Sequence, residues 1–323
     1  MLDRYGRVIN YLRISVTDRC NLRCCYCMPE GVQDVGMKNI LTFEEIWEIV
    51  RTGVSLGITH IRITGGEPLM RKGCVDLIRG IREIPGVETI TMTTNGVLLE
   101  NYGKQLKEAG VDGVNISLDT LDPEEFYKIT GKRELQEVLA GIRAAKTAGL
   151  PVKLNAVNRK ELDPIPLGRY AQEENLPIRF IEMMPVGYGK KYVGRSNEEL
   201  RETLEAVCGN AECMTNREEL SRMGSGPAVY YQFSDLKVPV GFISAIHGKF
   251  CDTCNRVRLT AEGYLKLCLC YDEGEDLRRV LREGEKENLR TIMEQTIFRK
   301  PAAHCFEHPA EMTETHEMVK IGG

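Results

Sequence analysis

The sequence has no apolar run that approaches the length of a transmembrane helix, and its first residues carry charge without the apolar core of a signal peptide. We therefore expect a cytoplasmic protein that does not bind a membrane. It also has little net charge: at −4, with a pI near 5.9, it has no general attraction for nucleic acid. Any anionic ligand must then be held by a local basic cluster.

Cysteine, by contrast, is abundant, with 12 in 323 residues. Without secretion a disulfide framework is not expected, and clustered thiols indicate metal or redox sites. Cys20, Cys24 and Cys27 have the spacing Cys-x-x-x-Cys-x-x-Cys, at which three thiolates can converge on one inorganic centre. A zinc site or buried structural thiols are the alternatives, but zinc usually takes four ligands, and Cys25 is poorly placed to be the fourth. Three ligands on a four-iron cluster would leave one iron open.

A second set of thiols lies in the C-terminal part of the chain. Cys251 and Cys254 are followed by Cys268, again a plausible cluster spacing, with a zinc ribbon as the alternative. Cys270 is a candidate fourth ligand, or a replacement for Cys268. The two sets together predict two iron–sulfur clusters, and the remaining cysteines without metal spacing are expected to be ordinary.

The first part of the chain repeats a strand-like run followed by a helix-like run, which is typical of parallel βα units. We expect strands at Leu12–Thr17, Ile58–Thr64, Thr89–Thr94, Gly113–Asp119, Val152–Val157 and Ile178–Met184. Because a closed barrel needs eight units, this number predicts an α/β fold with an incomplete (β/α)6 TIM-like barrel over residues 1–185. Residues 186–323 form a C-terminal region with the second thiol set, a hairpin at Tyr230–Phe233 and Val238–Ala245, and a charged helix over Glu275–Phe298.

Five of the six predicted strands alternate strictly between apolar and polar residues. In the first, Leu12, Ile14 and Val16 alternate with polar residues that include Arg13. The apolar set must face the helices, so the polar set faces the barrel interior and predicts a ligand cavity there. An antiparallel sheet with one wet face is the alternative, but the intervening helices favour parallel crossovers. The sixth strand does not alternate, and its faces are not assigned.

These motifs resemble those of a known family. Cys20-x-x-x-Cys24-x-x-Cys27 after a first strand, with Thr64-Gly65-Gly66-Glu67-Pro68 after the second, is similar to the radical S-adenosylmethionine (SAM) enzymes. Cys251-x-x-Cys254-x-Arg256-x-Arg258 with Cys268, and the terminal Gly322-Gly323, resemble more narrowly the GTP 3′,8-cyclases of molybdenum cofactor biosynthesis. The resemblance runs from Arg13 to the last residue.

The resemblance implies a lyase that converts GTP to (8S)-3′,8-cyclo-7,8-dihydroguanosine 5′-triphosphate, an early step of molybdopterin biosynthesis. It implies two [4Fe–4S] clusters and SAM as cofactors. The open iron of the first cluster would hold SAM and that of the second the guanine base. The implied partners are an electron donor and cyclic pyranopterin monophosphate synthase, which takes the product, with a homodimer left open. A radical SAM enzyme acting on a peptide, or an iron–sulfur electron carrier with four protein ligands per cluster, are the alternatives.

The resemblance also assigns residues by their match to the motifs. It assigns Cys20, Cys24 and Cys27 to the first cluster and Cys251, Cys254 and Cys268 to the second; Tyr26, Gly66, Ser117 and Met184 to SAM; and Arg13, Arg62, Thr93, Lys153, Arg256 and Arg258 to GTP. Gly322 and Gly323 would extend toward the active site. His60 stands where the family has lysine, which predicts a weaker or pH-dependent phosphate contact.

Overall fold

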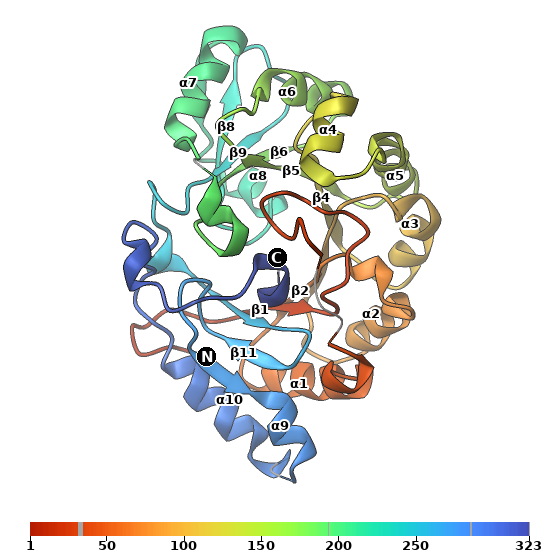
Figure 1. Ribbon diagram of the computed structural model, residues 1–323, viewed down its shortest axis with the longest axis vertical. Helices are drawn as coiled ribbons and strands as arrows, with labels where there is room; N and C mark the ends of the chain where they lie inside the picture. Colours follow the sequence, from red (N-terminus) through yellow and green to blue (C-terminus); the bar gives the residue numbers. More distant parts are fainter. Residues whose placement is uncertain (32–34, 193, 285, 323) are drawn as a thin grey trace.

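The computed structural model describes residues 1–31, 35–192, 194–284 and 286–322, and its centre is a 12-stranded sheet in the order β12-β11-β10-β1-β2-β3-β4-β5-β6-β9-β8-β7. The strands are β1 Tyr11–Ser15, β2 His60–Thr64, β3 Thr89–Thr94, β4 Gly113–Ser117, β5 Val152–Asn158, β6 Ile178–Glu182, β7 Ala211–Cys213, β8 Val229–Phe233, β9 Val240–Ile243, β10 Arg256–Leu259, β11 Tyr264–Lys266 and β12 Gly274–Asp276. The sheet curves around a central space, with most helices outside the curve (Figure 1).

The parallel part of the sheet is wider than the sequence predicts. Strands β1 to β6 pair in parallel as expected, which confirms the α/β class with a parallel core. Strand β10 adds in parallel beside β1, and β9 adds in parallel beside β6. The predicted hairpin is confirmed as the antiparallel pair of β8 and β9. The C-terminal region therefore extends the same sheet at both edges.

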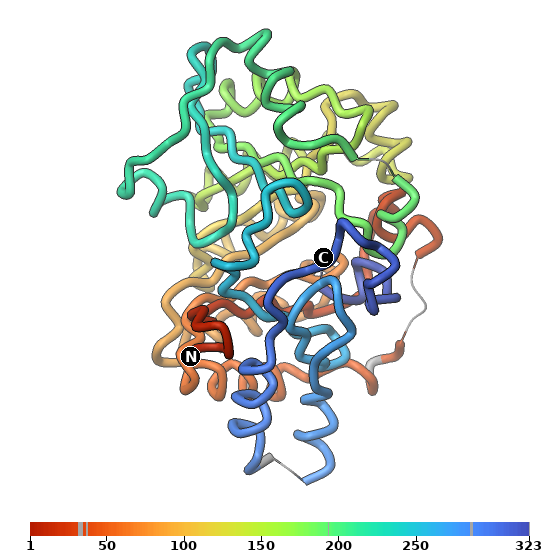
Figure 2. The backbone as a smooth tube through the Cα atoms, turned by 90° about the vertical axis from the view of Figure 1, so that its left-hand side faces the viewer, coloured from red at the N-terminus to blue at the C-terminus, as the bar shows by residue number. Residues whose placement is uncertain are grey.

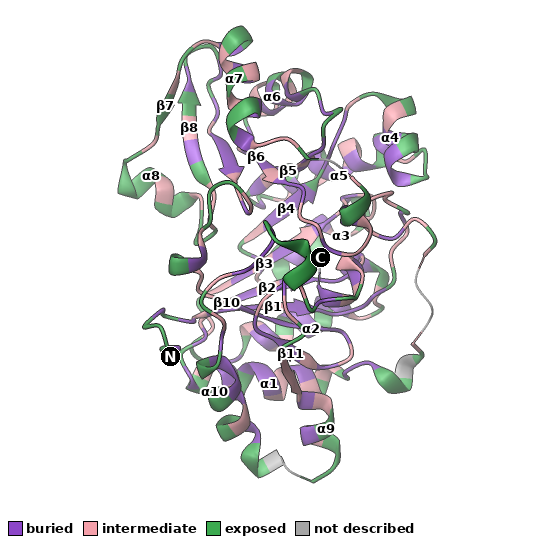
Figure 3. Cartoon of the chain, turned by 60° about the vertical axis from the view of Figure 1, so that its left-hand side comes forward, coloured by how far each residue is buried: buried purple, intermediate pink, exposed green. Residues whose placement is uncertain are grey.

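The helices cover the outer face of the sheet. They are α1 Phe43–Ser55, α2 Cys74–Arg82, α3 Leu99–Glu108, α4 Pro123–Thr130, α5 Leu135–Thr147, α6 Pro164–Glu173, α7 Asn197–Cys208, α8 Arg217–Arg222, α9 Leu277–Arg282 and α10 Leu289–Phe298. The apolar sets of the alternating strands, such as Leu12, Ile14 and Val16, are fully buried in one core with the helices. In Figure 3 the strands at the centre of the sheet are coloured largely as buried.

The helix predicted over Glu275–Phe298 is wrong. Glu275 belongs to β12, and the following residues form two separate helices, α9 and α10. The Asp276 side chain accepts a hydrogen bond from the Arg279 backbone and caps the start of α9. Gly284, at φ 88°, follows the C-cap of α9 in a left-handed conformation that favours glycine and interrupts a helix.

The two chain ends lie in different environments. The N-terminal residues pack near α10, where the Arg4 backbone N–H donates to the Phe298 carbonyl at 3.1 Å. The C-terminal residues, with a short 3₁₀ helix at Met318–Ile321, lie inside the curve of the sheet (Figures 1 and 2). Within the described residues, no helix has the length and apolar character needed to cross a membrane.

Candidate active site

A cavity opens on the concave side of the sheet, at the carboxyl ends of the parallel strands. Its wall includes most of the residues assigned above: Cys20, Cys24, Cys27, Tyr26, Gly66, Ser117, Met184, Arg13, Arg62, Thr93, Cys251, Cys254, Arg256, Arg258 and Cys268. Lys153 is not among the lining residues but lies near Arg179 and Arg62, which are. Gly322 contacts the wall through Arg13 and Arg258. Gly323 falls outside the described residues. The fold therefore gathers two distant thiol sets and a set of basic side chains around one space.

The first thiol set lies in the loop that follows β1. The Cys24 carbonyl accepts hydrogen bonds from the backbone N–H groups of Cys27 and Met28, both at 2.9 Å, which makes one tight turn. The loop is held to the end of α4 because the Cys25 N–H donates to the Ile129 carbonyl at 2.8 Å. The Cys25 side chain interacts with Tyr192 and is not on the cavity wall.

These thiols fit a cationic inorganic centre. Burial, with further contributions from neighbouring charges, raises the pKa of Cys20 to about 11 and that of Cys27 to about 12, and it raises the pKa of Cys24 well above the ordinary value. Three thiolates would therefore be costly here without a metal, whose charge favours the deprotonated ligand.

The spacing of the sulfur atoms favours a cluster over a single zinc ion. In tetrahedral zinc sites with Zn–S bonds of about 2.3 Å, ligand sulfurs lie about 3.8 Å apart. Among the described residues, the three potential ligands found within 4.8 Å of one another are Asp272, Glu314 and His316, and not either thiol set. In each set at least one pair of sulfurs is thus farther apart than 4.8 Å, a spacing that suits a larger iron–sulfur centre better than one zinc ion.

The glycine pair after β2 packs against backbone rather than against open space. A Cβ on Gly65 would lie 2.6 Å from the Thr17 carbonyl oxygen. A Cβ on Gly66 would lie 2.4 Å from the Arg19 carbonyl oxygen. The Gly66 N–H also donates to the Thr17 carbonyl at 2.7 Å. The first role of these glycines is therefore to let two loops touch.

Glu67 holds this turn to the next loop. Its buried carboxylate accepts hydrogen bonds from the Thr94 hydroxyl at 2.9 Å, the Asn95 backbone at 2.8 Å and the Leu69 backbone at 3.1 Å. Burial nevertheless raises the pKa of Glu67 to about 7. Asn95 in turn donates toward the Cys20 sulfur at 3.6 Å, so the Glu67 network orients a neighbour of the first thiol set.

Three arginines form a row across adjacent strands. Arg13 of β1 is in register with Arg258 of β10 on one side and with Arg62 of β2 on the other. Burial, followed by Arg258 and Arg62, lowers the pKa of Arg13 well below its ordinary value. Burial, followed by Arg256, lowers the pKa of Arg258 to about 10. Like charges opposite one another in a sheet destabilise it, and a bound polyanion would offset the repulsion along this row.

A second basic group lies farther along the sheet. Burial, followed by Arg179 and Arg62, lowers the pKa of Lys153 to about 8. Arg179 is buried on the cavity wall, where it donates to the Asn155 and Asn115 side chains. Sequence reasoning missed Arg179 because β6 does not alternate, although a single arginine between Ile178 and Phe180 is a usable signal. His60 is off the wall, with its Nδ1 2.7 Å from the Thr59 hydroxyl.

The second thiol set comes from two loops: Cys251 and Cys254 lie between β9 and β10, and Cys268 follows β11. Cys251, Cys254 and Cys268 all reach the cavity, whereas Cys270 is fully buried with its sulfur 3.0 Å from that of Cys305. Of the two candidate third ligands, the geometry therefore favours Cys268. Cys305, taken as ordinary from the sequence, is the partner of Cys270.

The binding region expected for SAM lies around the first thiol set. The Tyr26 hydroxyl donates to Asp119 at 2.7 Å, and the other Asp119 oxygen accepts the Val157 backbone N–H at 2.9 Å. This network links the thiol loop to the ends of β4 and β5. Ser117 and Met184 line the cavity with Tyr26.

The C-terminal segment reaches the arginine row. The Gly322 carbonyl accepts hydrogen bonds from Arg258 at 3.1 Å and from Arg13 at 3.5 Å. The Val319 N–H donates toward the Cys27 sulfur, and Lys320 pairs with Asp18 at 2.9 Å. The tail therefore touches the first thiol loop and the arginine row together.

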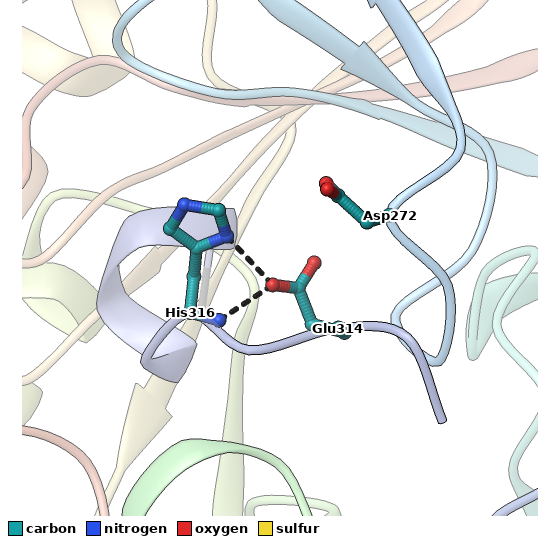
Figure 4. Close-up of side chains that lie close together, drawn as sticks. All are labelled: Asp272, Glu314 and His316. Carbon is teal, nitrogen blue, oxygen red and sulfur yellow. Dashed lines mark hydrogen bonds and ion pairs between the residues drawn. The ribbon is translucent and has the colours of Figure 1, made fainter. Parts of the chain in front are cut away.

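A buried ion pair anchors this segment upstream. Lys266 of β11 pairs with Glu314, whose other oxygen accepts the His316 backbone N–H at 2.6 Å and lies 2.8 Å from His316 Nδ1 (Figure 4). Asp272, Glu314 and His316 have potential ligand atoms within 4.8 Å of one another, which is the spacing of a metal site. Because Lys266 already neutralises Glu314, we take the group to be a tail anchor.

Comparison with known proteins gives two levels of similarity. Residues 14–163 match the model of the Radical SAM superfamily, and residues 176–306 match that of Molybdenum Cofactor Synthesis C. The chain also resembles the structure of Streptococcus suis SuiB bound to S-adenosylmethionine, with a TM-score of 0.65, 14% identity, and coverage of 97% of this chain and 77% of SuiB. At that identity the likeness shows the fold alone.

Curated relatives are much closer in sequence. The GTP 3′,8-cyclase of Clostridium perfringens (strain 13 / Type A) is 42% identical over 330 residues, with 100% of both chains covered. That of Thermodesulfovibrio yellowstonii is 44% identical over 332 residues, again with 100% of both chains covered. The thiol sets, the arginine row and the tail around one cavity agree with this similarity. The chain belongs to the GTP 3′,8-cyclase family of the radical SAM superfamily.

Proposed function

We propose that the cavity binds SAM and GTP side by side and that the chain converts GTP to (8S)-3′,8-cyclo-7,8-dihydroguanosine 5′-triphosphate. The observation that carries this proposal is the row of Arg258, Arg13 and Arg62, in register across three parallel strands and facing the same cavity as both thiol sets. A triphosphate has the charge and the oxygen geometry to bind guanidinium groups in pairs.

Cys20, Cys24 and Cys27 would hold one [4Fe–4S] cluster, and Tyr26, Gly66, Ser117 and Met184 would contact SAM beside it. When bound, this cluster and SAM supply the one-electron cleavage of the sulfonium that starts the reaction. The chain itself orients the thiol loop through Asn95 and Tyr26 and shields it by burial.

Cys251, Cys254 and Cys268 would hold the second [4Fe–4S] cluster. Three ligands leave one metal position for the guanine base. Arg256 and Arg258 follow Cys254 directly in β10, so the thiol set and the arginine row are parts of one element. The base and the triphosphate of one nucleotide can then be held at neighbouring places.

The other binding residues fit the triphosphate and the ribose between these groups. Thr93 Oγ1 is buried without a hydrogen-bond partner among the described residues, which suits a ligand oxygen. Lys153 would add charge behind Arg62. Fixing both reacting parts of GTP in one geometry is the main contribution that the chain makes to ring closure.

The tail and the partners complete the proposal. Gly322 would close the cavity at the arginine row, where its carbonyl is held by Arg258. The reaction also needs an external one-electron donor, and its product would pass to cyclic pyranopterin monophosphate synthase.

Anaerobic reconstitution followed by incubation with SAM, dithionite and GTP tests the proposal. The expected products are 5′-deoxyadenosine and the cyclised nucleotide. The Arg13→Gln variant should bind GTP about 10- to 100-fold more weakly, since it loses a charge-assisted contact, while SAM affinity is unchanged. Arg133→Gln, which removes an exposed arginine paired with Glu124, is the matched control and should behave as wild type. No cyclised product from the wild-type protein would defeat the proposal.

A further inference from the structure

One polar side chain on the cavity wall has no role in the site described so far. His304 is buried, with 7% exposure, and lines the cavity together with Cys251, Cys254 and Cys268. Its Nε2 is buried and has no hydrogen-bond partner among the described residues. In a residue that lines a cavity, a buried polar atom without a partner points to a ligand group that completes it.

The backbone determines what Nε2 can do. The Phe306 N–H donates to His304 Nδ1 at 3.4 Å, and the imidazole stacks on the Phe306 ring with centroids 4.4 Å apart. Because Nδ1 accepts this hydrogen bond, the ring hydrogen is on Nε2. The Glu307 carboxylate lies 3.8 Å from Nδ1, and the Ala245 backbone lies near the ring. With its hydrogen on Nε2, His304 presents an N–H donor at the cavity wall, and the complement of this donor is a hydrogen-bond acceptor.

The position of His304 selects the part of the ligand that it meets. The His304 backbone N–H donates toward the Cys251 sulfur, so the residue borders the second thiol set. Lys300 also lines the cavity near Cys251 and Cys254, but its Nζ donates to the Leu267 carbonyl. The arginines of the cavity wall lie on β1, β2, β6 and β10. A nucleotide with its phosphates on the arginine row would therefore bring its base, and not its phosphates, to His304.

Guanine and adenine differ in what they offer such a donor. Guanine has the acceptors O6 and N7, whereas adenine has a donor amino group in place of O6. O6 belongs to both the Watson–Crick edge and the Hoogsteen edge of guanine, so either edge would bring it to the second cluster. Resting on the proposed function, we propose that His304 Nε2–H donates to guanine O6 and is a specificity-determining residue that selects a 6-oxopurine over a 6-aminopurine.

Equilibrium binding to the anaerobically reconstituted protein tests this inference without turnover. The probes are GTP, inosine triphosphate, which keeps O6, and 2-aminopurine riboside triphosphate, which lacks it. His304→Phe keeps a ring against Phe306 but loses the donor. It should weaken GTP and inosine triphosphate about tenfold and leave 2-aminopurine riboside triphosphate unchanged. An equal loss for all three nucleotides would overturn the assignment.

A second pair of variants separates hydrogen bonding from packing. His304→Gln can place an amide N–H near the position of Nε2 and should recover GTP affinity to within about threefold of wild type. His304→Asn places its amide nearer Nδ1 and should resemble His304→Phe. Equal affinities for the Gln and Asn variants, at equal iron content, would overturn the inference. Failure of the wild-type protein to prefer GTP to ATP would instead count against the proposed function.

Discussion

Lys153 is the residue of the basic group whose charge changes within the range of ordinary buffers. Its ordinary pKa is 10.5, and burial, followed by Arg179 and Arg62, lowers it to about 8. In the empty site Lys153 is therefore charged below pH 8 and neutral above it. Since a triphosphate binds the charged form, GTP affinity should be highest below pH 8.

We expect GTP affinity to fall as the pH rises from 8 to about 9.5, by roughly tenfold per pH unit until the pKa of the bound state is reached. Isothermal titration calorimetry at fixed ionic strength measures this. Lys153→Arg keeps its charge over this range and should show a flat profile. The same fall in Lys153→Arg would assign the titration to another group.

At the scale of elements, the tail depends on one ion pair between β11 and the segment after α10. The side chains of Lys266 and Glu314 are 2% and 0% exposed. Breaking a buried pair leaves an uncompensated charge, whereas removing both charges does not. The pair therefore ties the loop that carries Cys268 to the segment that carries Gly322.

The Lys266→Met variant should lower the free energy of unfolding by about 3–5 kcal/mol, measured by anaerobic urea denaturation. Lys266→Met combined with Glu314→Gln should recover part of this loss, because Gln keeps an acceptor for His316. Arg222→Met removes an exposed pair with Glu218 and should cost less than about 1 kcal/mol. A double variant that is no more stable than Lys266→Met would contradict this account.

At the scale of the whole molecule, the N-terminus supports the second thiol set. The buried Arg7 guanidinium pairs with Asp3 at 2.6 Å and donates to the carbonyls of Cys251 at 2.9 Å, Pro301 at 2.7 Å and Ala302 at 2.7 Å. These contacts join residues 244 to 295 positions apart in the chain. One cation thus holds together three segments around Cys251.

Arg7→Met should destabilise the second cluster and spare the first, because the carbonyls around Cys251 lose their shared donor. Iron content after reconstitution should fall from about eight to about four per chain, while SAM binding persists. Arg4→Met, at an exposed neighbouring arginine, is the control and should keep its full iron content. Full iron in Arg7→Met, or loss of both clusters, would contradict the prediction.

Local pattern in the sequence determined which side chains share a face of the sheet and which share a loop. Arg13, Arg62 and Thr93 line the cavity as the alternation in their strands predicts, because successive side chains in a strand point to opposite faces. The thiol set at Cys20 is also encoded locally, since its spacing places three sulfurs in one loop. The capping box of Thr42 and Glu45 at the start of α1 is present for the same reason.

Only the tertiary structure decided which distant segments meet. It placed β9 and β10 in parallel at the two edges of the predicted sheet, and it paired Cys270 with Cys305 instead of the second thiol set. It also brought His304 and Gly322 to the cavity. Periodicity and spacing report the geometry of one segment, whereas these contacts depend on how the whole chain closes around a common core. No local pattern carries that information.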